Sequence, residues 1–358
     1  MPLRPLHIPL LLAVMALSLR AQDSAYFYHG YDYGSDAMYN PVSLILNGGF
    51  DMLQVDKPRD LTRIPFARGM DNVLRNLIDP FGPIGRYGAG NFLKDQVIPL
   101  GLSKKDGQWW PNYTLHLIGG GMTYAALEEW YRFHRYEYSK SLAAGTTILY
   151  HVVNEAVENG AYRGDNVDPI ADIYLFNIGG VILFSSDAVK RFFSRELNLA
   201  DWSLQPSFSL RNGHLENNGQ FFSIKWKLPS SERWHLFYFF GTNGVGGLSY
   251  KWEDGSALSF GVGMAAARLI TLNPGTNKQT LDLVWNAGLF YDLNNSLLTS
   301  LSVSRKTDYA VNLNVYPGII ALGEFSPGAW LALNRNGTFI VGMTAAWSPA
   351  GVALGTRP

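Results

Sequence analysis

The chain has 358 residues, and its 29 Lys and Arg residues balance its 29 Asp and Glu residues. Because basic residues are neither in excess nor clustered, we expect no nucleic-acid binding. The chain has no cysteine, which excludes disulfides, thiolate nucleophiles and cysteine-ligated metals. Low charge (16%), many aromatic residues (14%) and 37 glycines favour a β-rich membrane protein over a soluble enzyme.

The first 21 residues are predicted to be a secretory signal peptide. Arg4 precedes a short apolar run, Ile8–Leu19, and Ala21 completes a small-residue cleavage site. An apolar run of about a dozen residues is too short to span a bilayer, which takes ~20 residues. The sequence therefore predicts export, followed by removal of this segment.

Residues 22–107 are predicted to form an N-terminal arm and an irregular segment. The aromatic, turn-rich stretch Asp23–Gly34 is expected to be exposed. Asn40–Val55 fits either a strand or a short packed segment, and Gly69–Ile78 fits a short helix. The Gly and Pro content of Asp79–Gly90 predicts a loop.

Residues 108–195 are predicted to form a helical module of about three helices. Three runs have a helical apolar period: Thr114–His134, Ser139–Asn159 and Pro169–Arg191. Their apolar cores are too short and too polar to cross ~30 Å of hydrocarbon. We therefore expect the module in the periplasm or against the mouth of a barrel. The glycine run Gly119–Gly121 predicts close approach by a neighbouring element.

From residue 196 to residue 358 the apolar period changes to two, which predicts about ten antiparallel strands of about 8–12 residues each. The clearest segments are Ser203–Leu210, Phe222–Leu228, Leu281–Tyr291, Leu297–Arg305, Tyr309–Val315 and Phe339–Trp347. A soluble β-sandwich would also alternate. Small polar residues on the second face favour the narrow lumen of an outer-membrane-type β-barrel. Its aromatic girdle would comprise Trp226, Trp234, Tyr250, Trp252, Trp285, Tyr291, Trp330 and Trp347.

Four polar residues of the helical module are the candidate site: His116, His151, Glu155 and Asp172. His151 and Glu155 are four residues apart, so they share one face of a helix. Three interpretations are open. The residues could hold a metal ion, since imidazole and carboxylate suit Zn or Fe. A His–carboxylate pair could act as a general base on an envelope ester or phosphoester. The default is a buried hydrogen-bond network that locks the helices together.

The spacing of these residues resembles a known pattern. The motifs are His151-x-x-Asn154-Glu155-x-x-Glu158-Asn159, Asp168-Pro-x-x-Asp172-x-x-x-x-Asn177-x-Gly179-Gly180, and the upstream His116. They are similar to the His…Glu…Asp…Asn-x-x-Gly pattern of VanZ-like envelope domains, and to uncharacterised bacterial outer-membrane proteins that join a helical module to strands. The resemblance covers about 75 residues and implies a place in the cell envelope more than a particular reaction.

The sequence as a whole predicts an α+β membrane protein of the bacterial outer membrane, with the helical module before the barrel. The expected function is non-enzymatic, structural or transport-like. The alternative is a barrel-borne hydrolase that acts on envelope lipid through its His–carboxylate pair. No cofactor is predicted. The expected partner is outer-membrane lipid, and an envelope or cell-surface ligand is left open.

Overall fold

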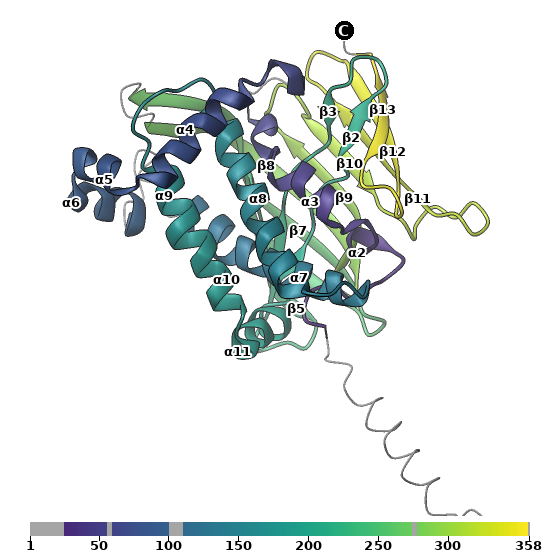
Figure 1. The fold of residues 1–358 in the computed structure, drawn as a ribbon. Helices are drawn as coiled ribbons and strands as arrows, with labels where there is room; N and C mark the ends of the chain where they lie inside the picture. Colours follow the sequence, from purple (N-terminus) through teal and green to yellow (C-terminus); the bar gives the residue numbers. More distant parts are fainter. Residues whose placement is uncertain (1–24, 56–58, 100–109, 274–277, 357–358) are drawn as a thin grey trace, which may run out of the picture.

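The computed structural model describes residues 25–55, 59–99, 110–273 and 278–356. The predicted signal peptide, residues 1–21, lies outside this part of the chain. Helices gather on one side of the molecule and strands on the other (Figure 1). The protein is therefore α+β, with its helices preceding its sheet in the chain.

The described residues between Gly34 and Val97 are largely helical, where the sequence predicted an irregular segment. The elements are α2 (Gly34–Met38), α3 (Pro41–Gly48), η1 (Asp51–Gln54), η2 (Leu61–Arg63), α4 (Phe66–Ile78), α5 (Phe81–Tyr87), α6 (Ala89–Phe92) and η3 (Leu93–Val97). The helix predicted at Gly69–Ile78 is confirmed within α4. The loop predicted at Asp79–Gly90 is wrong, because Pro80 is the N-cap of α5 and Pro83 lies in its first turn, where a missing N–H costs little.

The helical module is built from more pieces than the three predicted helices. They are η4 (Trp110–Gly119), α7 (Gly120–Phe133), α8 (Ser139–Asn159), α9 (Asp168–Ala171), η5 (Asp172–Asn177), α10 (Ile178–Phe184), α11 (Asp187–Arg191) and η6 (Phe192–Glu196). The helix predicted at Ser139–Asn159 is confirmed. The one predicted at Pro169–Arg191 is broken after Phe184, where the axis bends by 84°. Among the described residues, no single helix has the length and hydropathy of a membrane span, although this bent pair meets both criteria jointly.

The described part of the N-terminal arm packs on the protein, contrary to the predicted exposure, although His29 and Asp32 are exposed. Phe27 and Tyr28 are buried against the helical module. The backbone N–H groups of Tyr26, Phe27 and Tyr28 donate to the carboxylate of Glu129 on α7, at 2.8–2.9 Å. A buried carboxylate needs such donors, and here the arm supplies them.

Thirteen described strands form one sheet. They are β1 (Ala200–Asp201), β2 (Ser207–Ser209), β3 (Leu215–Glu216), β4 (Phe222–Lys227), β5 (Trp234–Phe240), β6 (Asn243–Lys251), β7 (Ser256–Asn273), β8 (Lys278–Leu293), β9 (Ser296–Ser304), β10 (Val311–Val315), β11 (Pro327–Leu333), β12 (Phe339–Ala345) and β13 (Gly351–Gly355). The strand order is β1-β4-β5-β6-β7-β8-β9-β10-β11-β12-β13-β2-β3. The predicted strand at Ser203–Leu210 shortens to β2, and strand lengths range more widely than expected.

The ten strands β4 to β13 are consecutive and antiparallel, as the alternation predicted. Among the described residues, β1 and β3 end the sheet without pairing to each other, so the predicted closed barrel is not observed as a continuous hydrogen-bonded ring. One segment nevertheless contacts both edges. Trp202 and Leu204 donate N–H groups to the carbonyls of Phe221 and Gly219, at 2.8 and 2.9 Å. Pro206 accepts from Gly351 at 2.8 Å.

The sheet is strongly curved around a filled interior. Lys225 on β4 and Asp292 on β8 form a buried ion pair of 2.7 Å, although three strands separate them in the sheet. The ring of Trp202 packs at a tilt against Phe237 and Phe290, with ring centroids 5.9 and 5.6 Å away. The residues between β1 and β4 thus fill the concave side.

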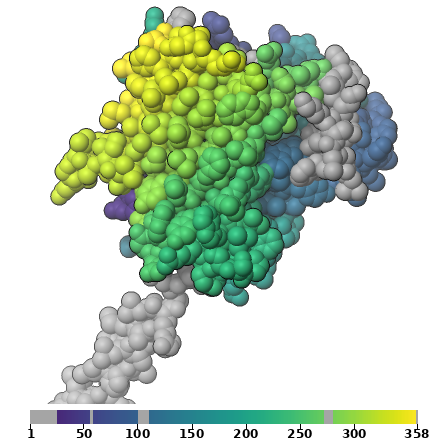
Figure 2. Space-filling model, turned by 180° about the vertical axis from the view of Figure 1, so that it is seen from behind, coloured from purple at the N-terminus to yellow at the C-terminus, as the bar shows by residue number. Residues whose placement is uncertain are grey.

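The outer face of the sheet is apolar and bare, and Figure 2 views the molecule from the side on which these strands lie. On β12, Phe339, Val341 and Met343 are exposed while Ile340 and Thr344 are buried. Exposed apolar side chains on other strands are Trp226, Trp234, Leu236, Leu248, Leu258, Phe260, Val262, Met264, Trp285, Leu289, Val352 and Leu354. Trp330, expected in the girdle, is instead buried and donates its Nε1–H to Ser207 Oγ at 2.9 Å.

Candidate functional site

Three of the four predicted site residues converge from different helices. His116 comes from η4, Glu155 from α8 and Asp172 from η5. One ligand atom of each lies within 4.8 Å of the other two. Every one of these side chains is buried, with 9%, 3% and 4% of the residue exposed. We call His116, Glu155 and Asp172 the module triad.

Each ring nitrogen of His116 faces a side-chain oxygen. Its Nδ1 lies 3.2 Å from Asn177 Oδ1, and its Nε2 lies 3.5 Å from Asp172 Oδ2. The first distance fits a hydrogen bond. The second is longer than the 2.7–2.9 Å of a charge-assisted N–H···O bond. Nε2 and the carboxylate therefore face each other across a gap.

His151 lies beside the module triad and does not complete it. Its ring centroid is 5.1 Å from that of His116, and its Nε2 has no hydrogen-bond partner. A methyl group at Gly120 would lie 2.8 Å from this Nε2 and 3.3 Å from Asn177 Oδ1. The glycine run thus makes room for His151, which confirms the predicted close approach.

The other two glycines of the run serve packing. A Cβ at Gly121 would lie 2.4 Å from the ring of Phe184 and 2.8 Å from the carbonyl oxygen of Gly180. A Cβ at Gly119 would lie 2.6 Å from the ring of Phe222 on β4. The run therefore lets η4 and α7 approach α10 on one side and the sheet on the other.

Burial dominates the electrostatics of the module triad and its neighbours. It lowers the pKa of His116 to about 4 and moves the pKa of His151 well below its usual value. Burial, reinforced by Asp172 and Glu158, raises the pKa of Glu155 well above its usual value. Asp172 has a raised pKa for the same reason, with Asp168 as its strongest charged neighbour. The charged neighbours of Glu155 and Asp172 are thus themselves acidic, which favours the protonated form of both carboxyl groups.

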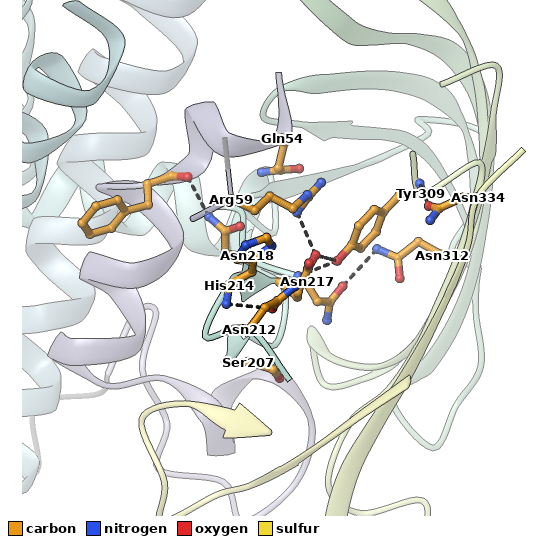
Figure 3. A network of polar contacts seen from close by, with 12 residues as sticks. Gln54, Arg59, Ser207, Asn212, His214, Asn217, Asn218, Tyr309, Asn312 and Asn334 are labelled. Carbon is orange, nitrogen blue, oxygen red and sulfur yellow. Dashed lines mark hydrogen bonds and ion pairs between the residues drawn. The ribbon is translucent and has the colours of Figure 1, made fainter. Parts of the chain in front are cut away.

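A second polar cluster lies inside the curved sheet, and Figure 3 shows it from close by. Arg59 contacts Glu216 at 3.4 Å, and Glu216 accepts from Tyr309 Oη at 2.6 Å. Amide side chains of Asn217 and Asn312 extend the network at 3.1 Å. We call these five residues the sheet network.

The sequence prediction missed the sheet network and the Lys225–Asp292 pair. A signal was present, because Lys225 alternates with Ile224 and Trp226 and so falls on the inward face of its strand. A lysine on that face requires a buried partner. Nothing local in the sequence indicates which acid that partner is.

Comparison of the chain with protein-family models, with curated proteins and with solved structures gives no match. The resemblance to VanZ-like domains therefore stays a prediction.

Proposed function

We propose that this chain is an outer-membrane-type β-barrel protein of the bacterial envelope. Its strands would lie in lipid, and its helical module would cap or flank the barrel from the aqueous side. The observation that carries the proposal is the inverted burial of the strands. Exposed positions are apolar and many buried positions are polar, which is the reverse of a soluble sheet.

The pattern is clear on single strands. On β5, Trp234 and Leu236 are exposed while His235 between them is buried. On β7, Phe260 is 55% exposed and Ser259 is fully buried. In water, a contiguous apolar surface of this kind would drive aggregation, since monomeric soluble proteins rarely expose large apolar patches. In lipid, the same surface is stabilising.

The segment 200–209 supports closure of the barrel. Up to Leu204, its backbone hydrogen bonds go to β4 and to the residues just before β4. From Pro206 onward they go to β13, so one residue, Gln205, separates the two sets of partners. An unpaired sheet edge is unfavourable in lipid, because each unsatisfied backbone group costs several kcal/mol there. In the proposed membrane form, this segment would complete the ring between the first and last meander strands.

The filled interior favours a structural role over an open pore. Trp202, Phe221, Phe239 and Tyr316 are buried inside the sheet together with the sheet network. The buried state of the module triad also favours a non-enzymatic role over the hydrolase alternative. A lipid ester needs access that side chains less than 10% exposed do not give.

Cell fractionation and gel migration test the proposal. The chain should be recovered with outer membranes. After mild detergent extraction it should migrate differently before and after boiling, because folded barrels resist unfolding in detergent. A chain recovered in the soluble periplasm without lipid, and with one migration position, would contradict the proposal.

A further inference from the structure

We propose that His116, Glu155 and Asp172 bind one divalent transition-metal ion within the helical module. The inference does not depend on the membrane placement of the sheet, because all three ligands belong to η4, α8 and η5. The ion would join three helical elements that are distant in the chain.

The lone pairs of three ligand atoms converge at the site. One nitrogen and two carboxylate oxygens lie within 4.8 Å of one another. His116 Nε2 faces Asp172 Oδ2 at 3.5 Å, too far for a charge-assisted hydrogen bond. Metal–ligand bonds of ~2.0–2.2 Å place ligand atoms about 3–3.6 Å from one another around a tetrahedral ion. The His–Asp distance matches that spacing.

The imidazole of His116 is oriented for binding a metal ion. Asn177 Oδ1 accepts from His116 Nδ1, so the single N–H of a neutral imidazole is used there. The Nε2 lone pair is then directed at Asp172 and Glu155. In metal-binding histidines, the ring nitrogen that does not bind the metal usually donates to a hydrogen-bond acceptor, which fixes the tautomer and the ring orientation.

Buried polar atoms at the site lack hydrogen-bond partners. Asp172 Oδ1 has no hydrogen-bond partner although the residue is only 4% exposed. His151 Nε2 is likewise unpartnered and buried. Among the described residues, no Lys or Arg forms an ion pair with Glu155 or Asp172. Buried carboxylates without a basic partner are neutralised by a proton or by a cation.

The donor set selects the class of ion. One imidazole and two carboxylates suit Zn²⁺ or Mn²⁺, whereas Mg²⁺ and Ca²⁺ prefer oxygen alone. Two ionised carboxylates match the charge of a divalent ion. His151 lies next to the site, and the lack of a side chain at Gly120 leaves space for its ring. A further ligand of the ion would therefore lie beside His151.

Metal content of the full-length protein in detergent tests this inference. The protein is stripped with a chelator, loaded with Zn²⁺ and freed of excess ion, and its metal is then counted by mass spectrometry. We expect one zinc per chain. His116→Gln and Asp172→Asn should each weaken binding by at least about tenfold. The matched surface changes His134→Gln and Asp187→Asn should not.

A second measurement covers variants that fail to fold. Co²⁺ bound to the parent protein should give the intense visible absorption of a four- or five-coordinate ion. The inference is overturned if folded parent protein keeps no zinc, or if its cobalt spectrum is that of the hydrated ion. It is also overturned if His134→Gln removes the zinc while His116→Gln leaves it, since the ion would then be a surface one. In each of these cases Glu155 and Asp172 share a proton instead.

Discussion

The two buried polar clusters of this protein differ in how their charges are matched. Inside the sheet, Arg59 contacts Glu216 and Lys225 contacts Asp292, so both of these basic side chains have an acidic partner. Inside the helical module, Glu155 lies against Asp172, and the nearest strong charges are also acidic. Matched clusters hold a fold together. A buried cluster of like charges reduces the stability of the fold, and such clusters are typical of ligand-binding and catalytic sites.

The comparison predicts opposite responses to the loss of one charge. Replacement of Lys225 leaves Asp292 buried without its cation, so Lys225→Met should destabilise the protein by about 3–5 kcal/mol. The double variant Lys225→Met/Asp292→Asn should recover most of that loss. Urea midpoints of the folded protein in detergent measure both.

Lys227 provides the matched control on the same strand. It pairs with Glu232, and both side chains are exposed, so Lys227→Met should cost at most about 1 kcal/mol. Equal effects of the Lys225 and Lys227 changes would show that the interior pair contributes no more than a surface pair. The account of the sheet interior would then be wrong.

A pH series sharpens the comparison at the junction between the two regions. Burial raises the pKa of Asp51, which accepts from Asn154 at 2.6 Å, to about 7. An acid whose pKa is higher in the folded state than in the unfolded state stabilises the fold when it is protonated. This contribution is fully present below the unfolded pKa of about 4 and is lost as the pH rises through 7. In metal-free buffer, parent stability relative to Asp51→Asn should therefore fall by about 2–4 kcal/mol between pH 4 and pH 8. A constant difference would contradict the burial of this carboxylate.

Variants of Glu155 test whether its carboxylate lacks a partner of opposite charge. In metal-free buffer, Glu155→Gln removes an ionisable acid from an acidic cluster and keeps the shape, so stability should change by less than about 1 kcal/mol or increase. Glu155→Ala leaves polar neighbours unpaired and should cost about 1–3 kcal/mol. Melting temperatures of both variants against the parent give the comparison. A large loss with Glu155→Gln would mean that the carboxylate is matched after all.

Two glycines of the module give the smallest effects, with opposite signs. A methyl group at Gly121 would overlap Phe184 and the carbonyl oxygen of Gly180, so Gly121→Ala should cost about 1–2 kcal/mol. Gly145 on α8 has open space around it, so Gly145→Ala should stabilise by about 0.5–1 kcal/mol. The same thermal melts separate the two. Stabilisation by both changes would contradict the close packing of α7 on α10.

Local features of this chain could be predicted from its sequence. The bounds of α8 follow from its apolar period and from the stop at Asn159–Gly160, where Gly160 has a positive φ. The turn at Asp254–Gly255 is likewise a local signal, with Gly255 at φ 88°. The meander strands follow from alternation of period two, which needs no knowledge of distant residues.

The rest depended on contacts between distant parts of the chain. Glu129 binds the N-terminal arm about a hundred residues away, and that contact buries an aromatic stretch which looked exposed. Trp330 faces inward because register fixes which face a strand residue takes. Helix spacing placed His151 and Glu155 on one face, but the convergence of His116 with Glu155 and Asp172 depends on packing between helices. The buried position of His151 beside them depends on the space left at Gly120.

The most direct test of the membrane account uses two neighbouring positions on β12. Val341 is exposed and Ile340 is buried, and the chain has no cysteine of its own. Single cysteines at these positions can be spin-labelled after reconstitution into liposomes, and their collision rates with oxygen and with a water-soluble nickel complex measured. The account predicts that the label at position 341 meets oxygen often and nickel rarely, while the label at 340 is immobilised and meets both rarely. Frequent collision of the 341 label with the nickel complex would place the outer face of the sheet in water and contradict the account.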